Sequence, residues 1–250
     1  MKSLQTLIIS AILLVSFSCA KSTVDGREYQ IGAYLWFQTS GEYRALCHQA
    51  YNLARLKLDR DLEEKHNGKR AVVFDIDETV LDNSFSGAYE IKNNIPWDQE
   101  SFDRWVALKK AELVPGAKEF IDYAISKRVE VIFISNRKES QKEDTLENFK
   151  RVGLTAKKEN LYFFNGDWSK ESRRFEVLKK YHVALYFGDN LGDFAKDWDS
   201  KTSESRRALV DARKEDFGDK FIVLPNPLYG DWEKSLPKFN MKSDLLKTIP

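Results

Sequence analysis

Short apolar runs alternate along the chain with segments whose apolar residues recur every three or four positions. Four runs have the length and composition of buried strands: 71–74, 129–134, 161–164 and 183–187. The segments between and beside them predict amphipathic helices at 117–125, 139–151 and 169–180. Because strand and helix alternate, we predict an α/β fold with a doubly wound parallel sheet and right-handed crossovers.

The segments outside this alternation predict further elements towards both ends of the chain. A polar tether covers 21–28, and a helical segment begins near Ser40 and ends at Asn67-Gly68. Cys47 lies within the apolar stripe of that segment, which indicates a core position. The C-terminal part predicts, in order, a charged helix, a last strand and a loop, at 195–216, 221–224 and 228–232.

Residues 84–115 interrupt the alternation with an irregular segment that is rich in aromatic residues. The segment is too long for a plain loop between a strand and a helix. We therefore predict an insertion that lies over the carboxyl end of the sheet. Together with the N-terminal and C-terminal segments, it is expected to form a small, mainly helical cap.

The N-terminal segment has the pattern of a secretory signal peptide. Lys2 precedes a short apolar run that ends at Ser18-Cys19, and a membrane span would need about 20 apolar residues. A cysteine at this place resembles a bacterial lipoprotein signal, so we expect Cys19 to become the lipidated first residue. The alternative is an ordinary cleaved signal, and hence a secreted or periplasmic protein. The predicted division is a leader at 1–19 and one domain at 20–250.

The composition is that of a folded, soluble chain without a strong charge bias. Of the 250 residues, 42% are hydrophobic and 32% are charged, which is ordinary for globular proteins. A formal net charge of +1 gives no basic excess, so nucleic acid is not an expected partner. The three histidines form no cluster along the sequence, which indicates against a zinc site.

Polar side chains suited to catalysis follow three of the predicted strands and begin one helix. In chain order they are Asp75 and Asp77, then Ser135, Asn136 and Arg137, then Lys170, then Asp189 and Asp193. The carboxyl ends of parallel strands lie at one edge of a sheet, so these side chains are expected to converge. Converging carboxylates repel one another and raise each other's pKa, so a cation is needed among them. Oxygen ligands favour Mg²⁺, and a carboxylate nucleophile beside a lysine suits phosphoryl transfer.

Each of these signals has an ordinary structural explanation when it stands alone. An Asp-x-Asp pair occurs at solvated strand ends, Gly-Asp-Asn forms turns, and Ser135 can cap a helix. Lys170 can lie on a solvated face, and Glu78 and Asp82 are more consistent with local hydrogen bonds than with catalysis. The joint occurrence of the motifs, in this order and at these places, favours one shared site.

In order, the segments DIDET, ISNR, Lys170 and GDNLGDF are similar to the four motifs of the haloacid dehalogenase superfamily of phosphatases. DIDETVLDNS together with GDNLGDF resembles more specifically the class C bacterial acid phosphatases, which are typically outer-membrane lipoproteins. The resemblance extends over nearly the whole mature chain, including 38–43, 114–117 and 224–232. It implies a haloacid dehalogenase-like fold and a place in the bacterial cell envelope, attached to the membrane through a lipid anchor only.

The resemblance also implies a role for each motif residue. Asp75 is the implied nucleophile, which forms an aspartyl-phosphate, and Asp77 is the implied acid and base. Mg²⁺ is implied to be held by Asp75, by the backbone carbonyl of Asp77 and by Asp189, with Asp193 in support. The other polar residues are implied to hold phosphoryl oxygens or to bind the substrate: Ser135 and Lys170, and Asn136 and Arg137 respectively.

By the same resemblance, the substrates are phosphomonoesters, particularly 5′-nucleotides and nicotinamide mononucleotide, hydrolysed at acid pH. The base-stacking aromatic residues correspond here to Phe102 and Tyr229, and the alternative is that both pack within the cap. Two other functions stay open: a surface lipoprotein that captures haem or a nucleotide on the same fold, and a phosphotransferase or phosphonatase. A homodimer also stays open.

Overall fold

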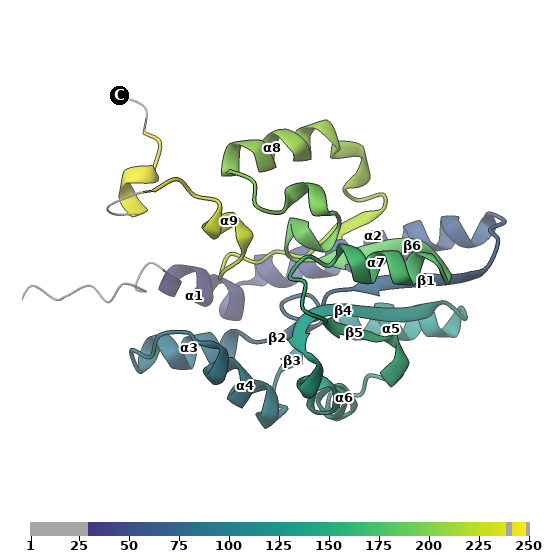
Figure 1. Ribbon diagram of the computed structural model, residues 1–250, viewed down its shortest axis with the longest axis horizontal. Coiled ribbons are helices and arrows are strands. Elements are labelled where there is room, and N and C mark those ends of the chain that lie inside the picture. The colour runs from purple at the N-terminus through teal and green to yellow at the C-terminus, as the bar shows by residue number, and fades with distance from the viewer. Residues whose placement is uncertain (1–29, 239–241, 249–250) are drawn as a thin grey trace, which may run out of the picture.

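The chain folds around a parallel sheet that is centred on the strand preceding Asp75. The computed structural model describes residues 30–238 and 242–248, so the predicted leader, Cys19 and the tether at 21–28 lie outside the described residues. In the described part, five strands form one sheet in the order β5-β4-β1-β6-β7, and each neighbouring pair is parallel (Figure 1). The strands are β1 (Lys69–Phe74), β4 (Glu130–Lys138), β5 (Leu161–Phe164), β6 (Tyr181–Gly188) and β7 (Phe221–Val223).

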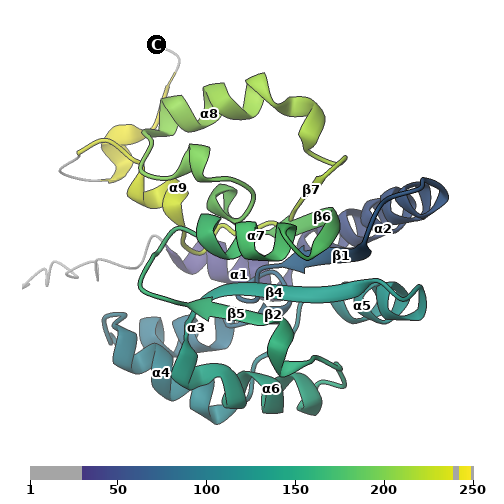
Figure 2. The same ribbon diagram turned by 45° about the vertical axis from the view of Figure 1, so that its right-hand side comes forward.

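The central strands direct alternate side chains into two cores, one on each face of the sheet. Val72 and Phe74 of β1 point to one core, and Ala71 and Val73 point to the other. Three helices pack against the first face, and two helices together with a short 3₁₀ turn pack against the second (Figures 1 and 2). The first three are α2 (Gly41–Glu63), α5 (Ala117–Ser126) and α6 (Lys142–Arg151), and the others are α7 (Glu171–Leu178), α8 (Ser203–Ala212) and η5 (Lys196–Trp198).

These layers confirm the predicted α/β fold with a doubly wound parallel sheet. The four predicted strands and the last candidate strand are all present. Several strand boundaries differ from the prediction, and the difference that affects the site is in β4. This strand continues to Lys138, so Ser135, Asn136 and Arg137 lie within it rather than after it. The pairing of β4 with β5 shifts between Ile134 and Lys138, and the polar motif occupies this irregular stretch of the ladder.

The structure adds a helix that the sequence pattern does not predict, α1 (Ile31–Thr39). Its sequence, IGAYLWFQT, is apolar almost all round, so it lacks the contrast between faces that marks an amphipathic helix. Tyr34 and Phe37 are buried, while Leu35 is exposed. Ser40 separates the two N-terminal helices, because its hydroxyl accepts a hydrogen bond from the Tyr43 N–H (3.1 Å) and caps α2.

The segment at 84–115 is helical, as expected of the cap. It contains α3 (Ser84–Lys92) and α4 (Gln99–Leu108), and an antiparallel ribbon of β2 (Leu81–Asp82) and β3 (Glu112–Leu113) closes its base. α4 is joined to the carboxyl end of β4 by an ion pair between Asp103 and Lys138 (2.6 Å). Figure 1 shows α3 and α4 beside the end of the sheet at which β1 and β4 finish, with α1 and α9 (Asp231–Lys234) near the same end.

The charged segment at 195–216 is only partly α-helical. α8 covers its centre, and 3₁₀ turns flank it at Lys196–Trp198 and Lys214–Asp216. The other 3₁₀ turns of the described chain are η2 (Glu139–Gln141), η3 (Lys158–Asn160), η4 (Leu191–Asp193) and η7 (Lys242–Leu245). Among the described residues, none of the helices combines the length and the hydropathy that a membrane crossing requires.

Candidate active site

Asp75 lies immediately after β1 and is the first polar residue at the carboxyl edge of the sheet. Its N–H donates to the carbonyl oxygen of Phe187 (2.9 Å), which extends the ladder between β1 and β6 by one step. The residue is only 8% exposed. Its carboxylate contacts the Nζ of Lys170, and that nitrogen also lies 2.6 Å from Asp193 Oδ1. The buried ammonium group of Lys170 therefore joins two carboxylates, one directly after β1 and the other in the turn after β6.

Asp75, Asp189 and Asp193 form a compact group of carboxylates. One oxygen from each lies within 4.8 Å of the others. Asp189 is held by hydrogen bonds from Thr79 Oγ1 (3.2 Å) and Asn226 Nδ2 (2.8 Å). Asp193 is held by the N–H of Asn190 (2.9 Å). The three side chains are thus fixed in place by the loops after β1, β6 and β7.

The surroundings of this group favour its neutral forms unless a cation is present. Burial, and then the neighbouring carboxylates of Asp193 and Asp189, raise the pKa of Asp75 well above its ordinary value, although Lys170 acts in the opposite direction. Burial and the carboxylate of Asp193 raise the pKa of Asp189 to about 7. Burial disfavours the charged form of Lys170, but Asp193 and Asp75 outweigh it, and the pKa of this lysine lies above its ordinary value.

A divalent cation fits this group of side chains. Carboxylate oxygens are the ligands that Mg²⁺ prefers, and a second positive charge beside Lys170 would remove the repulsion that raises the pKa of Asp75 and Asp189. Asp75, Asp189 and Asp193 are therefore the residues that could hold a metal ion. Together they are three of the four metal residues predicted from the sequence.

Asp77, the fourth, directs its carboxylate elsewhere. Its Oδ1 accepts hydrogen bonds from Arg137 Nη2 (2.7 Å) and Asn83 Nδ2 (2.8 Å). Its Oδ2 is less engaged, with Arg137 Nε at 3.3 Å and Ser135 Oγ at 3.5 Å. Oδ1 thus has the closer contacts and orients the side chain, and Oδ2 is the more weakly held oxygen. Coordination of a metal ion by the backbone carbonyl of Asp77 stays a prediction.

Arg137 is one of the most enclosed side chains of the site, and its side chain is 1% exposed. Besides the ion pair with Asp77, its Nη1 donates to Thr145 Oγ1 (2.9 Å) of α6. The predicted contact of Arg137 with substrate would require some of these bonds to break. Its visible action is to position Asp77.

Ser135 and Asn136 lie next to each other in the irregular stretch of β4. Ser135 is fully buried, and its hydroxyl accepts the N–H of Arg137 (3.1 Å). The side chain of Asn136 donates to the carbonyl oxygen of Trp168 (3.1 Å) in the loop before α7. Strand β4, which carries Ser135, and the loop before α7, which carries Lys170, are therefore joined directly.

Two arginines of α7 complete these connections, and sequence reasoning did not single them out. Arg173 donates to the carbonyl oxygen of Ser135 (2.6 Å) and to the side-chain oxygen of Asn136 (2.6 Å). Arg174 donates to the carbonyl oxygens of Gly192 (2.8 Å) and Asp193 (3.0 Å). Both are buried. Their spacing from Lys170, three and four positions, is the available signal, because such residues share one face of a helix.

The two predicted stacking residues lie in the cap segments. Phe102 of α4 lies under the guanidinium group of Arg137, whose Cζ is 5.8 Å from the ring centroid. Tyr229 is 40% exposed and lies in the loop before α9. Glu78 and Asp82 have the local roles expected of them, because they accept the N–H groups of Asn83 (2.8 Å) and Ser84 (2.8 Å).

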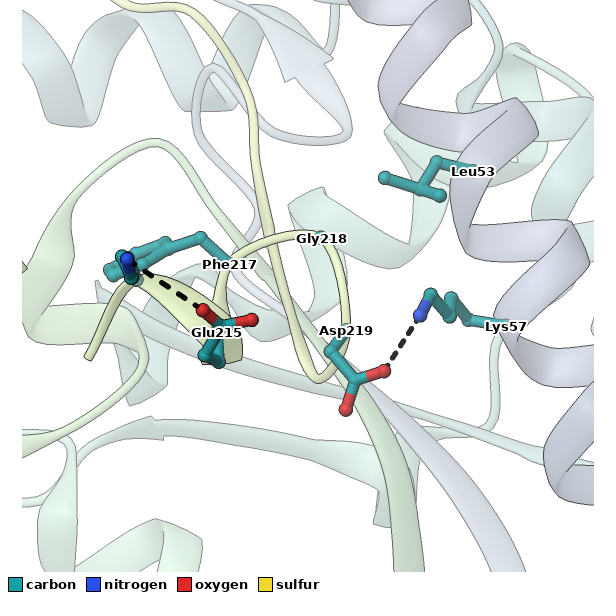
Figure 3. Close-up of a pocket in the computed structure, with 7 residues that line it drawn as sticks. Leu53, Lys57, Glu215, Phe217, Gly218 and Asp219 are labelled. Atoms are coloured by element: carbon teal, nitrogen blue, oxygen red, sulfur yellow. Dashed lines mark hydrogen bonds and ion pairs between the residues drawn. The ribbon is translucent and has the colours of Figure 1, made fainter.

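A separate surface pocket lies between α2 and the turn that precedes β7, away from these residues. It is lined by Leu53 and Lys57 of α2 and by Lys214, Glu215, Phe217, Gly218 and Asp219 of the turn. An ion pair between Lys57 and Asp219 (2.7 Å) lies within it (Figure 3). None of the predicted site residues lines this pocket. The chemistry of the chain is therefore assigned to the carboxyl edge of the sheet.

Comparison with known proteins supports this assignment. A family model described as HAD superfamily, subfamily IIIB (acid phosphatase), matches residues 18–232. A structure of the class C acid phosphatase from Bacillus anthracis is 42% identical over 85% of this chain and 89% of that chain, with a TM-score of 0.82. A second structure of that enzyme, with tungstate bound, is 39% identical over 91% of this chain and 99% of that one, with a TM-score of 0.84.

More distant relatives are also similar. The class B acid phosphatase of Edwardsiella ictaluri is 25% identical over 210 residues, which are 77% of this chain and 80% of that enzyme. Vegetative storage protein 1 of Arabidopsis thaliana is 26% identical over 182 residues, or 68% of this chain, and the chain spans 58% of that protein's length.

The parallel sheet and the four motifs at its carboxyl edge define a phosphatase of the haloacid dehalogenase class. More narrowly, the chain belongs to the subfamily IIIB acid phosphatases of this superfamily, and its similarity to the Bacillus anthracis structures places it with class C. It is a phosphoric monoester hydrolase, as the sequence motifs predict.

Proposed function

We propose that the chain is a Mg²⁺-dependent phosphomonoesterase that works through an aspartyl-phosphate on Asp75. The observation that carries this proposal is the contact of one buried lysine, Lys170, with both Asp75 and Asp193 beside a group of three carboxylates. An anionic nucleophile approaches an anionic phosphate only where positive charge screens both. Mg²⁺ held by Asp75, Asp189 and Asp193 supplies such charge when it is bound.

In the first step, an oxygen of Asp75 attacks phosphorus and the ester P–O bond breaks. The leaving alkoxide takes a proton from the carboxyl group of Asp77, and Oδ2 is the oxygen with the weaker contacts (3.3 and 3.5 Å). In the second step, the carboxylate of Asp77 accepts a proton from water, whose oxygen attacks the phosphorus of the aspartyl-phosphate. Phosphate leaves and Asp75 is restored.

Lys170 and Ser135 act on the transferred group. Lys170 Nζ lies beside the nucleophile, so it can neutralise charge that develops on the phosphoryl oxygens. Ser135 Oγ is buried, accepts the N–H of Arg137 and donates a long hydrogen bond to Asp77 Oδ2 (3.5 Å), and it can turn this proton to a phosphoryl oxygen when the ester is bound. Ser135 lies in β4 and Lys170 directly precedes α7, and the side chains of Asn136 and Arg173 connect these two segments.

The test of this mechanism is Asp75→Asn, which removes the nucleophile with little change in volume. We expect the variant to fold, to bind phosphate, and to lose turnover by more than about 10³-fold, because the covalent route is closed. Turnover is measured with a chromogenic phosphomonoester, and folding by circular dichroism. Trapping of wild-type protein with acid during turnover should give a phosphorylated Asp75 in mass spectrometry. A fully active Asp75→Asn variant would contradict the aspartyl-phosphate mechanism.

For the substrate, we propose 5′-nucleotides, including nicotinamide mononucleotide. Support comes from two aromatic residues in the cap segments, Phe102 beside Arg137 and the half-exposed Tyr229. Stacking of a base on an aromatic ring contributes about 1–3 kcal/mol, or roughly 5- to 150-fold in affinity. Phe102→Ala and Tyr229→Ala should therefore raise the KM for nucleotides and leave the KM for simple alkyl phosphates unchanged. Equal changes for both substrate classes would count against nucleotide recognition.

The proposed location is the bacterial outer membrane, with lipid on Cys19. The support is the sequence of the leader, in which a short apolar run ends at Ser18-Cys19. Labelling of bacteria with radioactive palmitate should mark the wild-type protein and not Cys19→Ser. An unlabelled wild-type protein would favour secretion instead.

A further inference from the structure

A second group of side chains that can bind a metal lies at the end of the sheet opposite the active site, where β1 and β6 begin. Asp61 is in the last turn of α2, His66 is in the loop that leads to β1, and His182 is the second residue of β6. In Figure 1 this is the right-hand end of the molecule, where α2 turns into β1. The histidines form no cluster along the sequence, and only the fold brings two of the three together.

Asp61 presents one oxygen to both imidazole rings. Its Oδ1 lies 2.7 Å from His182 Nε2 and 3.3 Å from His66 Nε2. Its Oδ2 is held by Arg70 Nε (2.7 Å), which fixes the orientation of the carboxylate. One ligand atom from each of Asp61, His66 and His182 lies within 4.8 Å of the other two. An arginine that orients a carboxylate in this way has the role of an outer partner in metal sites.

The Nε2 of His66 is shielded from solvent and has no hydrogen-bond partner among the residues that the structure describes. A buried polar nitrogen of this kind is unfavourable unless something binds it. It lies 3.3 Å from Asp61 Oδ1 and 3.4 Å from Glu64 Oε2, at ion-pairing distance from both carboxylates but without the alignment of a hydrogen bond. This unsatisfied atom is an independent sign that a ligand belongs here.

The electrostatic setting favours a cation. Asp61 and Glu64 are at the C-terminal end of the 23-residue helix α2, where the helix dipole carries partial negative charge. Their two carboxylates outnumber the one guanidinium group, that of Arg70, which contacts Asp61. A bound divalent ion would therefore be paired with negative charge.

We propose that Asp61, His66 and His182 bind a Zn²⁺ ion. Two imidazole nitrogens and a carboxylate oxygen are a usual donor set for zinc, whereas Mg²⁺ prefers oxygen ligands alone. Tetrahedral zinc with bonds of about 2.0–2.1 Å separates its ligand atoms by about 3.3 Å. The distance from His66 to Asp61, 3.3 Å, already meets this value, and His182 moves outward when zinc replaces its proton.

Ion binding also requires the two rings to turn apart. They are stacked with centroids 3.6 Å apart and planes at 13°, and one ion can lie in the plane of both rings only if these planes converge on it. His66 lies in a loop and can rotate, and Glu64, whose side chain is 62% exposed, can approach as a fourth ligand. The zinc ion would tie the end of α2 to the start of β6, which stabilises the fold without taking part in the chemistry.

The experiment is calorimetric titration of the full chain with ZnCl₂ at neutral pH in saturating Mg²⁺. We expect one zinc ion per chain at this site, with affinity reduced at least about tenfold in His66→Gln and in His182→Gln. His48→Gln removes the third histidine, which is exposed and outside the group, and should bind zinc as the wild type does. Zinc should raise Tm in the wild type and in His48→Gln, but not in His66→Gln or His182→Gln.

A substitution in the active site distinguishes zinc binding at the proposed site from metal binding at the active site. Asp189→Asn weakens the carboxylate group at the other edge of the sheet and should keep the zinc titration unchanged. Because zinc binds neutral imidazole, the affinity should also fall when the pH is lowered from neutral to 5. Anomalous scattering at the zinc edge should place the ion between the three side chains. The proposal is overturned if zinc does not bind the wild type, if both histidine variants bind it normally, or if only Asp189→Asn loses it.

Discussion

Lys170 connects Asp75, the proposed nucleophile, to Asp193 of the proposed metal-binding group through two short contacts. The lysine is buried, so each of these contacts acts in a medium of low dielectric constant. Removal of the lysine would leave three carboxylates without an internal partner of opposite charge, which is far more costly than loss of an exposed ion pair. At the scale of single residues, the site therefore requires each of its buried charges to have a partner of opposite charge.

The contacts of Arg137 predict a role in turnover rather than in binding. Arg137→Lys keeps a positive charge but cannot hold Asp77 and Thr145 together, as the guanidinium group does. Since acid–base catalysis contributes about 10²–10⁴-fold, we expect kcat to fall by about 10- to 100-fold with KM nearly unchanged. Steady-state kinetics measure both constants. A variant with an increased KM and a normal kcat would instead support direct binding of substrate by Arg137.

The raised pKa of Asp189, about 7, predicts a pH dependence of the metal-free protein. An unfolded aspartate ionises near pH 4, so between about pH 4 and 7 the native state keeps a proton that the unfolded state has released. Metal-free protein should therefore lose stability as the pH rises through this range. Mg²⁺ competes with that proton, so the rise in Tm on adding Mg²⁺ should be larger at pH 8 than at pH 5.

Thermal unfolding with Mg²⁺ and with chelator, at both pH values, provides the measurement. Asp189→Asn is the matched control, because it has no proton to release, and its response to Mg²⁺ should be smaller and less dependent on pH. An equal effect of Mg²⁺ on wild-type Tm at the two pH values would show that Asp189 does not govern the metal site.

At the scale of elements, α7 organises the site. Lys170, the residue before the helix, contacts Asp75. Arg173 and Arg174, in the first turn, donate to the backbone carbonyl oxygens of Ser135 and Asp193, respectively. A single rigid element thus sets the distances between three motifs. Strand ends alone do not fix these distances, because the loops that follow them are irregular.

Substitution of the two arginines of α7 should therefore have different effects, one on the Mg²⁺ requirement and the other on the KM for the phosphate ester. Arg174→Lys should raise the Mg²⁺ concentration needed for half-maximal activity by about 10- to 100-fold, because the loop of Asp193 loses its anchor. Arg173→Lys should chiefly raise the KM for the phosphate ester, because it loosens Ser135 and Asn136. Lys179→Gln, at the exposed end of the same helix, should change neither constant. Identical effects of the two arginine variants would indicate a general loss of structure.

The sequence predicts most elements of this architecture for physical reasons that act locally. Buried parallel strands are short and apolar, and polar residues at their ends are visible without any knowledge of contacts, which is why Asp75, Ser135 and Asp189 were found. α1 was not predicted because it has few polar positions to define a face. Arg173 was missed because a buried arginine is indistinguishable in sequence from a solvated one, and His66 and His182 because their proximity depends on strand pairing.

At the scale of the whole molecule, the sheet separates two cores that share the same strands. Phe149 of α6 lies in the core on one face and Trp198 in the core on the other, and both are fully buried. Because alternate residues of β1 reach both cores, a loss of packing on one face weakens the strands that support the other. The described domain should thus unfold as one unit.

Substitutions in the two cores test this expectation. Phe149→Ala and Trp198→Ala should each lower the free energy of unfolding by about 3–5 kcal/mol, with a single transition retained. Phe175→Ala, at a side chain that is 54% exposed, should have little effect. Urea unfolding followed by both fluorescence and circular dichroism gives the values. Two separated transitions in either core variant would show that the faces unfold independently.

The ribbon of β2 and β3 brings the two ends of the inserted segment together at two paired positions, Leu81 with Leu113 and Asp82 with Glu112. The helices between them, α3 and α4, carry Phe102 but none of the aspartates to which the proposed mechanism assigns the chemistry. Evolution can therefore replace much of this stretch between two fixed ends, provided that the contacts of α4 with β4, Asp103 with Lys138 and Phe102 with Arg137, are kept. Among related phosphatases, the sequence of this inserted segment would therefore change fastest. New substrates could then be acquired while the residues at the carboxyl edge of the sheet are inherited unchanged.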